Sequence, residues 1–257
     1  MTAGLFSVGD HRLKVDTTID GVGGPAVVLV SGTGDHSSDG FDEVIPLLSG
    51  LPLFCYARPG LGGSDPAPAT EPRGVRAAAH ELHALLSAAE IDPPWVLVGH
   101  SFGGLICEVF AAEWPGETAG LVFVDASDAQ LFLDVGHPVI DDGEGPGTIP
   151  FDMAASVRDL EQIRESVPMR PTVVVASRPG RWLESKTPDF WQPYTLAELD
   201  DRWQKYQAAL AERLGGDLIT AQVGGHYVQR DDPELVANAI RDICNQISVP
   251  GQHELRP

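Results

Sequence analysis

The stretch that decides the fold of this 257-residue chain is Trp95-Val96-Leu97-Val98-Gly99-His100-Ser101-Phe102-Gly103-Gly104. Its apolar first half is typical of a buried β-strand, and the residues that follow, 105–114, predict a helix. A Gly-x-Ser-x-Gly sequence between a strand and a helix is the pattern of a nucleophile elbow, which exposes a serine hydroxyl above the end of a sheet. Glycines flank Ser101 because so tight a turn leaves no room for a Cβ atom. The alternative is a glycine-rich turn with an incidental serine.

Strand and helix patterns alternate on both sides of this stretch. Buried strands are predicted by apolar runs at 25–30, 53–57, 120–124 and 172–176, and a last strand is predicted at 217–223. Helical periodicity is found at 74–90, 196–214 and 233–247. Near the start of the chain, alternating residues over 5–19 predict a β-hairpin. We therefore expect an α/β fold in which helices cover both faces of a mostly parallel sheet.

Residues 128–170 interrupt this alternation. They contain an acidic, glycine-rich run at 141–147 and one amphipathic helix, predicted over 151–167. An insertion of this length between two strands indicates a small lid rather than a second domain, because long inserted loops near a site are usually functional or mobile. We expect a single domain over 1–257 with a lid at approximately 128–170.

The composition restricts the partners that this chain can bind. It holds 37 acidic and 17 basic residues, a formal net charge of −20. Nucleic acids and anionic membrane surfaces need basic patches on their partners, so neither is expected to bind. Apolar stretches are too short to span a membrane, and residues 1–10 lack the pattern of a signal peptide. We expect a cytoplasmic protein that acts on a small-molecule substrate, and the sequence predicts no oligomeric state.

Neither a metal nor a cofactor is expected. Cys55, Cys107 and Cys244 are too scattered for a metal cluster or a disulfide framework, and they favour buried apolar roles. The run His80-Glu81-Leu82-His83 is one residue short of the spacing found in zinc proteases. The glycine-rich run 58–65 has the wrong spacing for a dinucleotide and is interpreted as a structural turn.

A serine hydroxyl becomes a useful nucleophile when a base accepts its proton, and the predicted base is His226. It lies just after the last predicted strand, and the carboxyl ends of parallel strands meet at one edge of a sheet. Three other histidines do not follow a predicted strand that ends there: His11, His137 and His253. His100, next to Ser101, is expected to point away from the hydroxyl and to pack or hydrogen-bond locally.

Four segments, in this order, resemble the α/β-hydrolase superfamily: 25–34, 57–65, 99–104, and Gly225-His226 followed by Pro233-Glu234. The resemblance covers nearly the whole chain except the lid. It implies the α/β-hydrolase fold, with an eight-stranded, mostly parallel sheet whose second strand is antiparallel. It also implies the chain order nucleophile, acid, histidine.

The acid is where this chain departs from the commonest pattern of that superfamily. Most relatives place it in the turn after the strand that follows the lid, but here that turn, 176–182, has no carboxylate. An earlier strand end carries Asp125, a position that some superfamily members use for the acid and many use structurally. The acid must orient the imidazole and stabilise the imidazolium, so proximity to the histidine matters more than its place in the sequence. We predict Asp125, with Glu184 and Asp189 as alternatives.

Acyl transfer also needs donors for the developing oxyanion. The backbone N–H of Phe102, directly after the proposed nucleophile, should be one. The resemblance implies that the second is the N–H of Thr33, in the loop Ser31-Gly32-Thr33. Relatives have a histidine at the start of this loop, and its bracing role is left here to Ser31 or His36.

These features predict a serine hydrolase that cleaves an ester, lactone or similar small acyl substrate through an acyl-enzyme, using a triad of Ser101, His226 and Asp125. The alternatives are a cyclase or lyase that uses the same site without hydrolysis, and a ligand-binding protein on this fold. Aromatic and apolar residues in and after the lid predict an apolar pocket or a packed lid: Phe132, Phe151, Met153, Trp182, Phe190, Trp191 and Tyr194.

Overall fold

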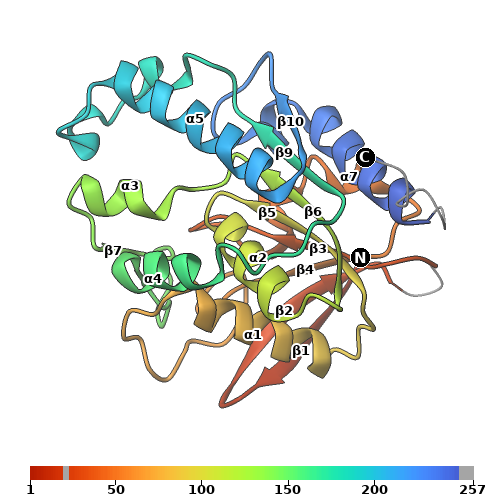
Figure 1. Ribbon diagram of the computed structural model, residues 1–257. Coiled ribbons are helices and arrows are strands. Elements are labelled where there is room, and N and C mark those ends of the chain that lie inside the picture. The colour runs from red at the N-terminus through yellow and green to blue at the C-terminus, as the bar shows by residue number, and fades with distance from the viewer. Residues whose placement is uncertain (20–22, 249–257) are drawn as a thin grey trace.

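The strand that leads into the elbow, β5 (Trp95–His100), lies in the middle of an eight-stranded sheet in the computed structural model, which describes residues 1–19 and 23–248 (Figure 1). The strand order is β1-β2-β4-β3-β5-β6-β9-β10. The other strands are β1 (Thr2–Val8), β2 (His11–Thr17), β3 (Val27–Val30), β4 (Leu53–Tyr56), β6 (Thr118–Val124), β9 (Thr172–Ala176) and β10 (Asp217–Thr220).

The sheet has the predicted mixed topology. Strand β2 runs antiparallel to both of its neighbours, β1 and β4, whereas β4, β3, β5, β6, β9 and β10 pair in parallel. The carboxyl ends of the parallel strands therefore share one edge, where polar loops from different parts of the chain can meet. The α/β-hydrolase fold expected from the sequence is confirmed.

Helices cover both faces of the sheet because its central strands are apolar on both sides. In β5, Leu97 points into one core and its neighbours Val96 and Val98 point into the other. Helices α1 (Val75–Ala88), α2 (Phe102–Glu113) and the end of α5 (Leu196–Leu214) belong to the first core, and α7 (Pro233–Ser248) belongs to the second. Each large side chain buried in this way contributes about 1.5–3 kcal/mol.

The segment predicted as a lid contains α3 (Ala129–Asp134), the short strand pair β7 (Val139–Ile140) and β8 (Phe151–Asp152), and α4 (Met153–Ile163). Helix α4 is shorter than the predicted 151–167. It begins at Met153 because the carboxylate of Asp152 caps its first turn, accepting from the N–H of Ala155 at 2.9 Å. Helix α4 packs against α1, α2 and α3.

A second excursion follows β9 and contains the 3₁₀ turns η3 (Arg181–Glu184) and η4 (Pro188–Trp191) before α5 begins. It lies on the same side of the molecule as α3 and α4, at the left of the view in Figure 1. Leu131 of α3 packs with Trp182 of this second excursion and with Trp203 of α5. Residues of both excursions line the same pocket. Among the helices that the structure describes, none is long and apolar enough to cross a membrane.

Candidate active site

Ser101 is held in a strained turn between β5 and α2. Its backbone has φ 53° and ψ −121°, a region that residues with a side chain rarely adopt. A Cβ atom on Gly99 would come within 2.6 Å of the backbone of Gly103, and one on Gly103 would overlap the carbonyl oxygen of Val30. The turn therefore needs glycine at both positions, as the sequence pattern predicts.

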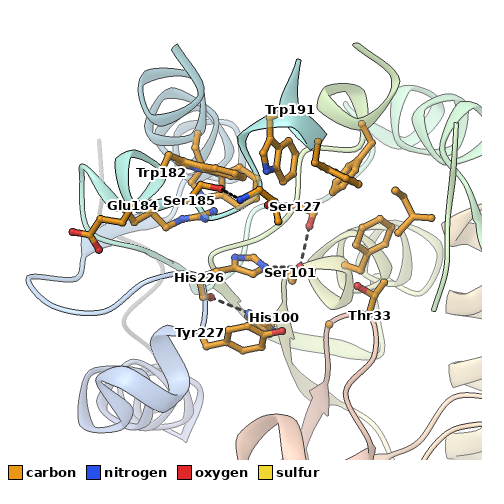
Figure 2. Close-up of a pocket in the computed structure, with 18 residues that line it drawn as sticks. Thr33, His100, Ser101, Ser127, Trp182, Glu184, Ser185, Trp191, His226 and Tyr227 are labelled. Atoms are coloured by element: carbon orange, nitrogen blue, oxygen red, sulfur yellow. Dashed lines mark hydrogen bonds between the residues drawn. The ribbon is translucent and has the colours of Figure 1, made fainter. Parts of the chain in front are cut away.

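His226 joins Ser101 to a carboxylate. Its Nε2 atom lies 2.9 Å from the Ser101 Oγ atom, and its Nδ1 atom lies 2.8 Å from Oδ2 of Asp125. Figure 2 shows the imidazole of His226 directed at Ser101 from a different segment of the chain. This is the geometry of a serine, histidine and acid relay, in which the histidine can accept the proton of the hydroxyl.

Asp125 is completely buried at the end of β6, yet both oxygens of its carboxylate have hydrogen-bond donors. Oδ1 accepts from Nε1 of Trp203 at 2.7 Å and from the N–H of Ser177 at 2.9 Å. Oδ2 accepts from His226 and also lies 3.2 Å from Nη2 of Arg181. Burial opposes ionisation, but the hydrogen bond from His226 and the charge of Arg181 outweigh it and hold the pKa of Asp125 below its ordinary value.

The alternative acids lie away from this pair. Glu184 is exposed and forms an ion pair with Arg178 at 2.6 Å, and Asp189 is exposed on η4. Among the hydrogen bonds and ion pairs within 1–19 and 23–248, the carboxylate on His226 is that of Asp125.

The remaining histidines do not approach the Ser101 hydroxyl in the part of the chain that is described. His100 points away from it, as expected, but its Nε2 atom contacts the backbone carbonyl of His226 at 3.0 Å, far away in sequence (Figure 2). His11 lies beside Glu81, and His137 hydrogen-bonds to the carbonyl of Phe190. His253 lies outside the described residues.

The protonation state of His226 suits a base. Burial lowers the pKa of His226 to about 4; the hydrogen bond to Asp125 opposes this shift, and the nearby His100 and Arg181 add to it. The imidazole is therefore neutral near pH 7 and can accept a proton there.

The two predicted oxyanion donors belong to residues that line the pocket around Ser101, Phe102 at the start of α2 and Thr33 on the loop after β3. The first N–H groups of a helix have no carbonyl partner within it and carry the positive end of the helix dipole. Negative charge that forms beside Ser101 is favoured at this place.

Arg58 braces the Thr33 loop, a role that the sequence analysis left to Ser31 or His36. Its guanidinium donates to the carbonyl oxygens of Ser31 at 2.8 Å and Gly32 at 2.6 Å. The same group forms a bidentate, fully buried ion pair with Asp142, with both N···O distances 2.6 Å. His36 instead accepts from the N–H of Gly62 at 3.0 Å. The oxyanion loop is thus tied through Arg58 to the segment predicted as a lid.

Ser127 is a further residue at the site that the sequence analysis missed. Its Oγ atom lies 3.1 Å from Ser101 Oγ, and its N–H donates to the Ser101 carbonyl at 3.1 Å (Figure 2). The one available signal was its position, two residues beyond the acid at the end of β6.

A cavity of about 430 Å³ opens above Ser101. Aromatic side chains from both excursions and from α5 form much of its wall: Phe132, Trp182, Phe190, Trp191 and Trp203. The prediction of an aromatic pocket holds for Phe132, Trp182, Phe190 and Trp191, and Trp203 was not among the predicted residues. It does not hold for Phe151 and Met153, which pack in the main core, or for Tyr194, which packs beside the cluster of Trp182 and Trp203.

Comparisons with known proteins agree with this geometry. A family profile described as the alpha/beta hydrolase family matches residues 27–239. Among curated proteins, the probable transporter efuK of Hormonema carpetanum is 31% identical over 95% of this chain and 43% of its own length. Human monoglyceride lipase is 31% identical over 38% of this chain and 34% of its own. The chain therefore spans less than half the length of both curated relatives.

Solved structures agree on the fold. A thermophilic esterase from Thermogutta terrifontis superposes with a TM-score of 0.66 at 15% identity, over 97% of this chain and 100% of that one. At such low identity the likeness establishes the fold alone.

Proposed function

The chain belongs to the alpha/beta hydrolase family, and on this premise we propose that it is a serine hydrolase that cleaves an ester, lactone or similar small acyl substrate. The observation that carries the proposal is the continuous path of hydrogen bonds from Ser101 Oγ through His226 to Asp125, at 2.9 and 2.8 Å. A serine activated in this way attacks carbonyl carbon.

In the proposed reaction His226 takes the proton of Ser101 as the Oγ atom bonds to the carbonyl carbon of the substrate. The carbonyl oxygen becomes an oxyanion beside the N–H groups of Phe102 and Thr33. Asp125 stabilises the imidazolium of His226, which then gives its proton to the departing alcohol and leaves an acyl-enzyme. A water molecule, deprotonated by His226, attacks the acyl carbon, and the acid product leaves as the proton returns to Ser101.

The cavity supports the proposed substrate class. Its volume of about 430 Å³ suits a small ligand, and its aromatic wall suits an apolar acyl or alcohol group. The similarity to human monoglyceride lipase supports ester hydrolysis. In this proposal residues 128–170 serve as a lid on a single hydrolase domain, and Phe132 and Ile140 are the side chains that they contribute to the pocket.

A fluorophosphonate probe tests the chemistry directly, because it phosphonylates a serine activated by a neighbouring base. We expect labelling of the wild-type protein at Ser101, no labelling of Ser101→Ala, and turnover of p-nitrophenyl esters that falls as the acyl chain outgrows the cavity. A folded wild-type protein that is not labelled would contradict the proposal. Labelling without turnover of any ester or lactone would point instead to the cyclase or lyase chemistry.

A further inference from the structure

The turn after β9 contains two arginines and no carboxylate. Residues 177–182 include Arg178 and Arg181, and the side chain of Arg181 turns inward, with 10% of its surface exposed. Its guanidinium carbon lies 4.0 Å from the centre of the Trp182 ring and 4.6 Å from that of Trp203. Nε donates to the Ser177 hydroxyl at 2.9 Å. These contacts hold the guanidinium in one orientation.

That orientation directs a cation at the proposed catalytic acid. Nη2 of Arg181 lies 3.2 Å from Oδ2 of Asp125, the same oxygen that accepts from His226 at 2.8 Å. The other oxygen is already occupied by Trp203 and Ser177. Asp125 therefore has no oxygen that interacts with His226 alone.

We infer that Arg181 is a positioning residue that acts through Asp125: it shares the carboxylate oxygen that orients His226 and so limits how strongly the acid stabilises the imidazolium. This inference deepens the proposed function and rests on it. A guanidinium stays charged at all working pH values, whereas the imidazole is charged only after it accepts a proton. Protonation of His226 thus places a second cation beside Asp125, whose charge Arg181 already neutralises in part. Repulsion between the imidazolium and the guanidinium is strong in the low dielectric of a buried site, so it opposes this protonation.

The consequence is a base that resists protonation by solvent. Burial is the largest cause of the lowered pKa of His226, and the charge of Arg181 acts in the same direction. Neutral His226 then persists into acidic solution, so the proposed hydrolase stays active there.

Other charged groups surround His226, but they are already paired or lie farther from Asp125. Asp35 pairs with Arg230 at 2.8 Å and lies 3.7 Å from His100. Glu184 pairs with Arg178. Two carboxylates accept backbone N–H groups: Asp200 from Gly180 and Trp182, and Asp231 from Gly225. Tyr227 packs against the rings of His100 and His226. Within the described residues, Arg181 is the cationic side chain that forms an ion pair with Asp125 besides His226.

The test compares Arg181→Gln, which removes the charge, with Arg181→Lys, which keeps it. Arg178→Gln is the matched control, because it removes a cation from the same turn without a contact to Asp125. The first readout is the NMR titration of the His226 imidazole, assigned by its loss in His226→Asn. The second is the pH profile of kcat/KM on p-nitrophenyl butyrate.

We expect the pKa of His226 to rise by about 1 in Arg181→Gln, less in Arg181→Lys, and to stay in place in Arg178→Gln. The acid limb of kcat/KM should move with it. A uniform loss of rate with no shift of the midpoint would mean that Arg181 only holds the fold, and it would overturn the inference. An equal shift in Arg178→Gln would overturn it too, since the effect would then be general to the turn.

A further measurement on the wild-type protein keeps the inference testable even if Arg181→Gln does not fold. The Nη2–H signal of Arg181, the nitrogen that lies 3.2 Å from Oδ2 of Asp125, should titrate with the midpoint of His226. An Nη2–H signal that does not change at this midpoint would contradict shared binding to Asp125. The NMR titrations need no turnover, so failure of the inference and failure of the proposed hydrolysis can be told apart.

Discussion

Ser101 and Asp125 occupy equivalent positions, each directly after the last residue of one of two neighbouring parallel strands. His100 of β5 lies opposite Val124 of β6 in the sheet register, and the N–H of Ser101 donates to the Val124 carbonyl at 3.1 Å. Both residues have positive φ values, 53° for Ser101 and 44° for Asp125. Two adjacent sharp turns thus lift a hydroxyl and a carboxylate to one edge, and His226 bridges them from beyond β10.

The assignment of the acid predicts that Asp125→Asn lowers kcat on p-nitrophenyl butyrate by about 10⁴-fold, because an amide cannot hold the imidazole in the right tautomer or stabilise its charge. Asp189→Asn, an exposed residue away from the cavity lining, is the control and should keep its rate. Circular dichroism verifies that both variants are folded. Near-full activity of Asp125→Asn would contradict this assignment and would mean that another carboxylate is the acid.

The buried pair of Arg58 and Asp142 predicts separate effects on stability and on rate. Arg58→Met leaves a buried carboxylate unpaired and should lower the free energy of unfolding by about 3–5 kcal/mol, measured with urea. Adding Asp142→Leu should restore much of that stability, since two apolar side chains can replace a buried ion pair. The rate should not recover, because the carbonyls of Ser31 and Gly32 have lost their donor.

The expected loss of kcat in this double variant is up to about 10²-fold, the order of effect of one poorly placed oxyanion donor. A stable double variant with the wild-type kcat would show that Arg58 does not brace the loop for catalysis.

The contact between the hydroxyls of Ser101 and Ser127 predicts a smaller effect on the rate. Ser127→Ala removes one of the two hydrogen-bond partners that Ser101 Oγ has among residues 1–19 and 23–248. It should lower kcat/KM about fivefold, the equivalent of one ordinary hydrogen bond. The fluorophosphonate labelling rate should fall by a similar factor, because both reactions begin with the same hydroxyl. An unchanged labelling rate would mean that Ser127 plays no part in positioning the nucleophile.

The lowered pKa of His226 predicts how stability changes with pH. The imidazole of the unfolded chain takes up a proton near its ordinary pKa of 6.5, while the folded protein resists protonation until about 4. Protons therefore favour the unfolded chain in this window, and the free energy of unfolding should fall as the pH drops from 6.5 towards 4, with at most about 1.4 kcal/mol per pH unit from this residue. Urea unfolding of His226→Gln should give a flatter dependence over the same window, and an equally steep one would contradict the prediction.

Much of the fold could be predicted from sequence because its strands and long helices have strong periodic signals. The helix predicted at 196–214 is α5 itself, with its start fixed by the capping box of Thr195 and Glu198. The short strands β7 and β8 could not be predicted, because a strand of two residues is too short to show an alternation of apolar and polar residues. Helix α4 was predicted too long because its apolar pattern continues past the turn in which it ends at Ile163.

Strand ends also explain how far the site could be predicted. Ser101, Asp125 and His226 each follow a strand that ends at the same edge of the sheet, so their proximity could be predicted from the sequence alone. Arg58 and Arg181 follow strands of the same sheet, but their contacts depend on which way a long side chain turns. No short motif encodes that choice, because the partners, Asp142 and Asp125, lie 84 and 56 residues away in the chain, respectively.

The ion pair of Arg58 with Asp142 has a consequence for the order in which the molecule is assembled during synthesis. The elbow and its helix leave the ribosome well before Asp142, and Asp142 well before His226. A nascent chain that has already folded β3, β4 and β5 therefore exposes Ser101 without a fixed oxyanion loop and without a base. The proposed hydrolysis therefore cannot begin before His226, which follows β10, has been translated.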